Sequence, residues 1–347
     1  MNSPRPNDPY INVFLDTQFF DANQLDFFNK TFDVLRLNVA AGHIRVFSTA
    51  VTQQEVERHV RERAQKINAK LESIRNDSIL RHVTCAPFDS FRVTPTTTDI
   101  VDVMLTQLKE SWDRLETRTL PISEVDLPSI LDDYFAGRPP FGSGRKKSEF
   151  PDAVAASALR IWCEAHSQRM HIVSGDSDWE STCEVVLEFS FHREVAEVLE
   201  QFPDANISNA IRQWITSNMP AVKEEIADAF MKHKLSHSQR VKRRILNADV
   251  TWIRIDDVFV ILAENGVATV QVPCKIKYRS RKLRKDAPSI LDAATLSDSG
   301  ATIETISRTK AVAELSVQYD EANVSQCEIN NVQIALRRPF GLGFGRN

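Results

Sequence analysis

Cysteine is scarce in this sequence and is not arranged for zinc or for a disulfide framework. The five cysteines among the 347 residues are scattered, and none forms a CxxC pair or lies beside a cluster of histidines. Structural zinc sites are built from such closely spaced ligands, so their absence argues against one. An odd number of isolated thiols is typical of a reducing compartment. The sequence therefore predicts unbridged cysteines and a cytoplasmic location.

Long apolar runs and signal-like segments are also lacking. No stretch of about 18 apolar residues occurs in the sequence, and a transmembrane helix needs about 20. The first residues, MNSPRPNDPY, lack the apolar core of a secretory signal. We therefore expect neither secretion nor insertion into a membrane.

The sequence has no excess of positive charge, the usual overall signature of nucleic-acid binding. Its formal net charge is -4, with 43 Lys and Arg against 47 Asp and Glu. A polyanionic partner must then be attracted by a local group of cations or by a bound metal ion. No internal repeat is present. The length and the ordinary composition, 42% hydrophobic and 26% charged, fit a globular chain of two domains.

Strand and helix patterns alternate through the first two hundred residues. Short apolar runs at 11–15, 44–48, 170–174 and 186–191 have the character of buried strands. Helical patterns are expected at 19–35, 52–71, 97–116, 124–136, 152–166 and from about 193. A surface loop rich in Gly, Pro and cations is expected at 137–151. This alternation predicts an α/β architecture, a doubly wound parallel sheet with helices on both faces, over residues 8–200.

The rest of the chain changes in character. Residues 201–245 are helical and increasingly basic, which predicts a helical linker. Residues 246–338 contain segments with partial period-2 alternation, the pattern of a β-rich accessory domain. Within it, a long loop or short helix is expected at 283–308, and a turn or bulge at Asp256 and Asp257. A flexible tail is expected at 339–347.

One segment of the accessory domain is strongly basic. KIKYRSRKLRK at 275–285 has seven cations in eleven residues. As a strand, it would place Lys275, Lys277 and Arg279 on one face, together with Arg281, and Tyr278 on the other. Such a face could follow a nucleic-acid backbone. We prefer the alternative, an edge strand that its charge protects against aggregation.

Four short acidic stretches follow or open the elements of the first domain. They are FLDT at 14–17, TQQEV at 52–56, EFPDA at 149–153 and SGDSD at 174–178. Each places a carboxylate near the end of a strand or the start of a helix, where an open parallel sheet gathers its active-site groups. Converging carboxylates repel one another and need shared protons or bound cations. Oxygen ligands of this kind favour Mg²⁺ or Mn²⁺.

Each acid taken alone has an ordinary structural explanation. Asp16 can cap a turn after a strand. Thr52 and Glu55 have the spacing of a capping box. Asp152 stands in a first helical turn, where the helix dipole favours any acid, and Asp176 lies in a strand-to-helix turn. Only the joint order of the four stretches indicates a shared site.

That order resembles the PIN domain family of metal-dependent nucleases, over about 190 residues. FLDT is similar to the family's first strand, STAVTQQEV to its second strand and helix, and SGDSDW to its Thr/Ser-x-Asp-x-Asp-aromatic turn. The segment PPFGSGRKKSEFPDA is similar to a subgroup with a long insertion before the helix, carried by many bacterial proteins. The resemblance implies a PIN-like α/β fold and a metal-dependent nuclease.

The resemblance also implies roles for individual residues. The catalytic acids and metal ligands would be Asp16, Glu55, Asp152 and Asp176. The groups that support them would be Thr17, Glu149, Ser174 and Asp178. Beside them, the loop cations Arg145, Lys146 and Lys147 are suited to binding substrate phosphates, and a solubilising loop tip is the alternative. No histidine is assigned as a general base.

The predicted function is a metal-dependent endoribonuclease that acts on single-stranded RNA. RNA follows from the resemblance, and a single strand follows from a narrow acidic cleft beside a basic loop. Restraint by an inhibitory partner protein or by a homo-oligomer is expected, as for a toxin or defence effector. Two alternatives stay open: a DNA nuclease of the same chemistry, and a non-catalytic RNA-binding or scaffold protein.

Overall fold

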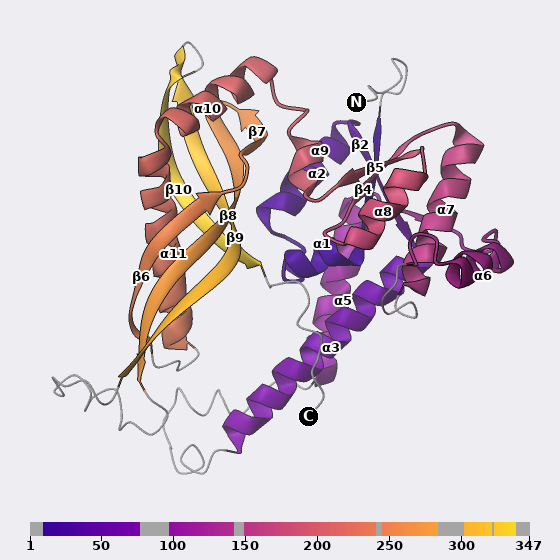
Figure 1. The fold of residues 1–347 in the computed structure, drawn as a ribbon, viewed down its shortest axis with the longest axis horizontal. Coiled ribbons are helices and arrows are strands. Elements are labelled where there is room, and N and C mark those ends of the chain that lie inside the picture. Colours follow the sequence, from indigo (N-terminus) through magenta and orange to yellow (C-terminus); the bar gives the residue numbers. More distant parts are fainter. Residues whose placement is uncertain are drawn as a thin grey trace. The chain divides into compact units, whose positions relative to one another are not determined.

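Two units make up the chain, Met1–Val195 and Ala196–Asn347. The computed structural model describes residues 10–76, 97–141, 149–240, 245–283, 302–320 and 323–337 (Figure 1). Within these ranges, no helix combines the length and the apolar character that crossing a bilayer requires.

The first unit is built on a parallel five-stranded sheet with the strand order β3-β2-β1-β4-β5. Its strands are β1 (Ile11–Leu15), β2 (Ile44–Thr49), β3 (Arg118–Leu120), β4 (Met170–Val173) and β5 (Phe189–His192). In the central strand β1, Val13 is aligned with Val46 of β2 on one side and with His171 of β4 on the other. The predicted parallel sheet is therefore confirmed.

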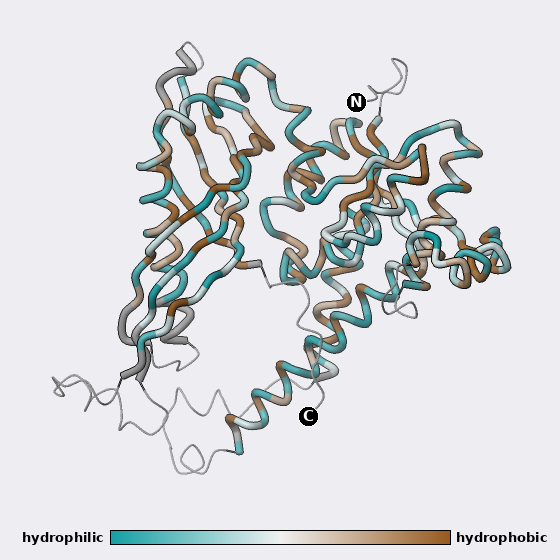
Figure 2. The backbone as a smooth tube through the Cα atoms, in the orientation of Figure 1, coloured by the Kyte–Doolittle hydropathy of each residue, from teal (hydrophilic) through white to brown (hydrophobic). Residues whose placement is uncertain are grey.

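Helices cover both faces of this sheet. They are α1 (Thr17–Ala22), α2 (Lys30–Ala40), α3 (Ala50–Arg75), α5 (Thr97–Arg114), α6 (Leu127–Ala136), α7 (Phe150–His166) and α8 (Ser177–Val185), and α9 (Val195–Leu199) follows at the unit boundary. Phe14 and Phe47 pack against α7 and α8 on one face. Val13 and Leu15 point to the opposite face and are buried as well. Figure 2 accordingly shows strongly hydrophobic stretches in the sheet strands, whereas hydrophilic residues predominate along α3.

The segment after β1 differs from its prediction. The sequence predicts one helical pattern from Phe19 to Leu35, but the structure has two helices, α1 and α2. Gln24 and Leu25 both adopt a φ of 58°, a left-handed conformation that an α-helix cannot contain. Asn29 then starts α2 by accepting hydrogen bonds from two backbone N–H groups of its first turn.

The start of α3 also differs. Its cap is Thr49, whose hydroxyl accepts a hydrogen bond from the Thr52 backbone N–H at 3.2 Å. The predicted capping box of Thr52 and Glu55 is therefore wrong. Glu55 lies in the second turn of the helix, so its carboxylate is not used for capping and can make tertiary contacts.

The second unit combines two helices with an antiparallel sheet of strand order β10-β9-β8-β6, in which β7 also pairs with β8. Its elements are α10 (Ala205–Ser217), α11 (Met219–Arg240), β6 (Ile245–Ile255), β7 (Phe259–Glu264), β8 (Val267–Leu283), β9 (Thr302–Asp320) and β10 (Asn323–Arg337). The two helices share one hydrophobic core with the sheet. Because α11 contacts both outer strands, β6 and β10, the sheet curves around this helix.

Two predictions for the accessory domain are wrong. The basic segment from residue 275 belongs to β8 as far as Leu283, and β8 is an interior strand with β9 on one side and β6 and β7 on the other. It is therefore not an edge strand. Residues 302–308 belong to β9 rather than to a loop, and 284–301 lie outside the described residues. Asp256 and Asp257 lie in the connection between β6 and β7, as predicted.

Candidate active site

The four acidic stretches meet at one edge of the parallel sheet. Asp16 follows β1, Glu55 lies in α3 just after β2, and Asp176 lies just after β4. The strands β2, β1 and β4 are neighbours in the sheet, so their carboxyl ends lie side by side. Asp152 lies in the first turn of α7. It is close enough to the other three acids for their charges to raise its pKa.

Asp16 is held at the centre of this edge. Its carboxylate is only 4% exposed, and its Oδ2 accepts hydrogen bonds from Ser174 Oγ at 2.7 Å and from the Gln18 backbone N–H at 3.4 Å. Burial raises the pKa of Asp16 to about 6, against these hydrogen bonds, and the charge of Asp176 adds to the rise. Ser174, expected beside Asp176, therefore holds Asp16 through a direct hydrogen bond.

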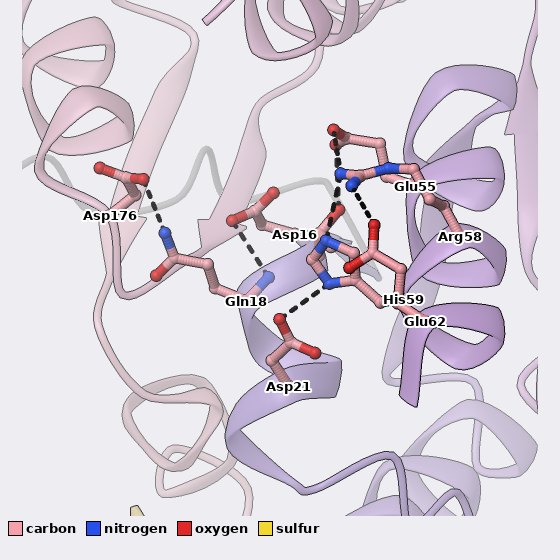
Figure 3. A network of polar contacts seen from close by, with 9 residues as sticks. Asp16, Gln18, Asp21, Glu55, Arg58, His59, Glu62 and Asp176 are labelled. Atoms are coloured by element: carbon pink, nitrogen blue, oxygen red, sulfur yellow. Dashed lines mark hydrogen bonds and ion pairs between the residues drawn. The ribbon is translucent and has the colours of Figure 1, made fainter. Parts of the chain in front are cut away.

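Gln18 links two of the acids and carries no signal in the sequence. Its Nε2 donates a hydrogen bond to Asp176 Oδ2 at 2.6 Å, and its backbone N–H donates to Asp16 (Figure 3). Its Oε1 is buried and has no hydrogen-bond partner among the described residues. Gln18 therefore fixes the relative position of Asp16 and Asp176 and presents an unsatisfied amide oxygen near them.

Asp176 and Ser174 form the turn between β4 and α8. Asp176 caps α8, because its Oδ1 accepts from the Asp178 backbone N–H at 3.0 Å, while its own backbone N–H donates to Ser174 Oγ at 3.0 Å. Ser174 thus donates to Asp16 and accepts from Asp176. These bonds explain the spacing of Ser174 and Asp176 in SGDSD.

Glu55 is held by a hydroxyl and a cation. Thr17 Oγ1 donates a hydrogen bond to Glu55 Oε2 at 3.3 Å, and Arg58 NH2 lies 3.8 Å from Glu55 Oε1. The side chain of Thr17, predicted as a neighbour of Asp16, therefore supports a different acid. The contact ties α1 to α3 beside the sheet edge.

A polar chain continues from Arg58 away from the acids. Arg58 pairs with Glu62 at 2.8 Å and contacts His59 Nε2 at 3.2 Å, while His59 Nδ1 lies 2.8 Å from Asp21 Oδ2 (Figure 3). The hydrogen bond with Asp21 raises the pKa of His59. His59 is thus engaged with α1.

Asp152 experiences the combined charge of the cluster. Burial raises its pKa to about 8, and the charges of Asp16, Glu55 and Asp176 add to the rise in that order. The Trp179 indole lowers this pKa, but its buried Nε1 makes no regular hydrogen bond with any described residue. We therefore treat the contact with Trp179 as weak. An acid in this position requires a proton or a cation.

Glu149 and Asp178 extend the acidic cluster. Glu149 is the residue at the cap of α7 and is 7% exposed. Burial raises the pKa of Asp178, and the charges of Asp176 and Glu149 raise it further. Asp178 therefore lies near both Asp176 and Glu149.

The basic loop residues Arg145, Lys146 and Lys147 lie outside the described residues. Two residues of the predicted surface loop, Pro140 and Phe141, are buried. Phe141 is 0% exposed and packs on Tyr134 and Phe150, with ring centroids 5.4 and 5.0 Å away. The prediction of a surface loop at 137–151 is therefore wrong at Pro140 and Phe141, because an aromatic cluster ties the chain to α6 and α7.

Among the residues that the structure describes, no three or more His, Cys, Asp or Glu side chains are arranged to hold a metal ion. The four acids nevertheless interact electrostatically, and the Gln18 Oε1 is an unsatisfied oxygen beside two of them. Their chemistry, carboxylate and amide oxygens, fits a hard cation such as Mg²⁺ or Mn²⁺. A bound ion would require some of these side chains to turn toward it.

Comparison with known families supports this interpretation of the first unit. A model of the PIN domain family matches residues 13–179, from β1 into α8. The matched range contains Asp16, Glu55, Asp152 and Asp176, and the predicted resemblance is confirmed. A search of curated proteins gives no match. The second unit lies entirely outside the matched range.

Proposed function

We propose that this chain, which carries a PIN domain over residues 13–179 and with it the fold of a nuclease family, is a metal-dependent endoribonuclease acting on single-stranded RNA. The observation that carries this proposal is the convergence of Asp16, Glu55, Asp152 and Asp176 at the carboxyl edge of the parallel sheet. This edge is where an open parallel sheet gathers its active-site groups, which supports the proposal. The choice of RNA rests on resemblance to the family.

The acids fit a divalent cation. Asp16, Asp152 and Asp176 would bind Mg²⁺ or Mn²⁺ directly, and Glu55 directly or through water, because hard cations take oxygen ligands and Mg²⁺ keeps several waters. When bound, such an ion lowers the pKa of water and neutralises negative charge on the phosphate.

The surrounding side chains position the acids for this task. Ser174 and Gln18 hold Asp16 and Asp176 through hydrogen bonds of 2.7 and 2.6 Å, and Thr17 orients Glu55. Burial raises the pKa of Asp152, and the charges of the other three acids raise it further, so a bound cation would stabilise the ionised cluster. The loop cations Arg145, Lys146 and Lys147, a few residues before Asp152 in the chain, are suited to holding the phosphates of a strand on either side of the cut.

The test is cleavage of a labelled single-stranded RNA in Mn²⁺, in Mg²⁺ and in EDTA. Wild type is compared with Asp16→Asn, Asp152→Asn and a control, Asp102→Asn, which removes an exposed acid on α5. Cleavage is expected only with metal, and it should be lost in the two site variants and kept in the control. A matched DNA strand in the same assay decides between RNA and DNA.

Two results would contradict the proposal. Cleavage of equal rate in EDTA would exclude metal-dependent chemistry. No cleavage by wild type, with equal RNA binding in all variants, would indicate a non-catalytic RNA-binding or scaffold protein.

We also infer that the activity is restrained in the cytoplasm, where unchecked hydrolysis of RNA would damage the cell. An inhibitory partner protein or a homo-oligomer would provide the restraint, as in a toxin or defence effector. Overexpression tests this: wild type should slow growth once it exceeds its partner, and Asp152→Asn should not. Active wild-type protein that leaves growth unchanged at high expression would count against restraint.

A further inference from the structure

One face of the second unit's sheet is not covered by that unit's described helices. Side chains that alternate along β8 and β9, such as Ile276, Tyr278 and Leu315, pack into the core with α10 and α11. The residues between them point to the opposite face. No described helix of this unit lies on that opposite face, which we call the open face.

The open face carries three rows of cross-strand neighbours from β6, β8 and β9. The rows are Asp249, Arg279 and Ile306; Trp252, Lys277 and Arg308; and Arg254, Lys275 and Lys310. They contain six cations and one acid, and Asp256 lies beside the last row. These three rows are therefore strongly positive, in a chain whose formal net charge is -4, although Glu304 and Glu314 lie on the same face beyond them.

Most of these cations are not explained by ion pairs. Arg254 and Lys275 share Asp256, at 3.0 and 3.5 Å. Lys277, Arg279, Arg308 and Lys310 form no ion pair with any described residue. Lys277 lies directly opposite Arg308, and Lys275 directly opposite Lys310, and like charges in such positions destabilise a sheet. Protection of an edge does not explain them, because β8 is an interior strand.

An exposed aromatic side chain stands in the middle row. Trp252 is 48% exposed and neighbours Lys277 across the strands. A tryptophan among unpaired cations is the combination that binds single-stranded nucleic acids, in which bases stack on the ring and cations contact phosphates. Tyr278, the aromatic residue of the basic segment, does not take part, since it is 8% exposed and packs on Phe230 with ring centroids 5.1 Å apart.

We propose that the open face binds a single-stranded nucleic acid, with a base stacked on Trp252 and phosphates held by Lys277, Arg279, Arg308 and Lys310. The inference deepens the proposed function and rests on it for the identity of the ligand, because the strand would be the nuclease's own substrate. The charge of the face is complementary to a phosphate backbone. The second unit thereby supplies affinity, and the first unit supplies the chemistry.

The experiment measures binding separately from cleavage. The full chain is titrated onto a fluorescent single-stranded RNA in EDTA, over a series of salt concentrations, and the fluorescence anisotropy gives the affinity. The variants are Lys277→Gln with Arg308→Gln, and Trp252→Ala. The control is Lys232→Gln, which removes an exposed cation of α11, the helix on the core side of the sheet.

The two site variants should differ in kind. Lys277→Gln with Arg308→Gln removes two phosphate contacts and should weaken binding. The slope of log affinity against log salt concentration should become smaller in magnitude by about 1.4, since each contact to a single strand contributes about 0.7. Trp252→Ala should weaken binding on the order of tenfold without changing this slope, because stacking does not release ions. Lys232→Gln should leave both quantities unchanged.

Several outcomes would overturn the inference. Equal affinity and equal salt dependence in wild type, both site variants and the control would do so. Tight binding of duplex or of heparin, with no effect of Trp252→Ala, would do so as well. A single-stranded DNA of the same sequence separates recognition of RNA from recognition of any single strand. Wild type that binds as expected but never cleaves RNA would contradict the proposed function and leave this inference standing. Wild type that cleaves RNA, with open-face variants that bind RNA as tightly as wild type, would contradict this inference and leave the proposed function standing.

Discussion

The two units of this chain use their sheets in different ways. In the first unit both faces of a parallel sheet are buried, so mid-strand side chains such as Phe14 serve packing, and Asp16, Glu55 and Asp176 lie beyond the carboxyl ends of the strands. In the second unit helices cover one face of an antiparallel sheet, so alternate mid-strand residues such as Lys277 are available to a ligand. Sheet type thus decides whether binding groups appear after a strand or inside it.

The largest expected effect tests whether the chemistry lies at the edge of the parallel sheet. Asp16→Asn should reduce metal-dependent RNA cleavage by at least about 100-fold, since changes to groups that only support metal ligands already cost about 10- to 100-fold. Single-turnover cleavage at saturating Mn²⁺ is the measurement. Cleavage within a few-fold of wild type would remove the acidic edge from the mechanism and shift attention to the second unit.

The next prediction concerns Gln18, which positions two of the acids through hydrogen bonds. Gln18→Ala removes the 2.6 Å hydrogen bond to Asp176 and should lower cleavage at limiting metal by about 10- to 100-fold. The Mn²⁺ concentration for half-maximal activity should rise, which a general loss of stability would not cause. Gln53→Ala is the matched control, because that glutamine bonds to Thr119 on the surface. An unchanged metal requirement would contradict the role.

The four acids that meet at the sheet edge could be selected from the sequence, and the contacts that hold them only in part. Asp16, Glu55, Asp152 and Asp176 could be found because each is adjacent to an apolar run or a helix start. Gln18 could not, since its partner Asp176 is 158 residues away and the contact exists only after β1 and β4 pair.

The errors have the same origin in contacts distant along the chain. The three-residue strand β3 has no apolar run and exists because it pairs with β2. The edge-strand prediction for the basic segment failed because the strands on either side of it, β6 and β9, are separate segments of the chain. Thr49 and Thr52 are both plausible caps locally, and the end of β2 decides between them.

A third prediction tests a pair of histidines inside the parallel sheet. His171 Nδ1 lies 2.9 Å from His192 Nε2 on the neighbouring strand. Burial lowers the pKa of His171 from 6.5 to about 4, and the charges of His192 and Arg169 lower it further. The unfolded chain therefore binds the proton of His171 more tightly than the folded chain does. The stability that neutral His171 contributes is complete above about pH 6.5 and is lost as the pH falls toward 4.

Between pH 7.5 and pH 5, the free energy of unfolding should fall more for wild type than for His171→Leu. The expected difference is about 1 to 2 kcal/mol, allowing for the partial exposure of the ring. The comparison between variants is needed because the raised pKa values of Asp16 and Asp152 act in the opposite direction over this range. Urea unfolding at the two pH values gives the free energies, and His166→Leu, at the exposed end of α7, should behave as wild type. Equal pH dependence in all three proteins would show that the pair is not a source of acid sensitivity.

The smallest expected effect concerns the joint between β2 and α3. Thr49 is fully buried, and its hydroxyl contacts both the Thr52 backbone N–H at 3.2 Å and the Thr52 hydroxyl at 3.0 Å. Thr49→Ala should lower the free energy of unfolding by about 1 kcal/mol, the typical value of a helix cap. Glu55 lies on the second turn of the same helix. Cleavage should therefore fall only if the loss of the cap moves the start of α3. Thr49→Ser, which keeps the capping oxygen, should restore most of the stability, and failure of serine to do so would show that the buried methyl group, rather than the cap, stabilises this joint.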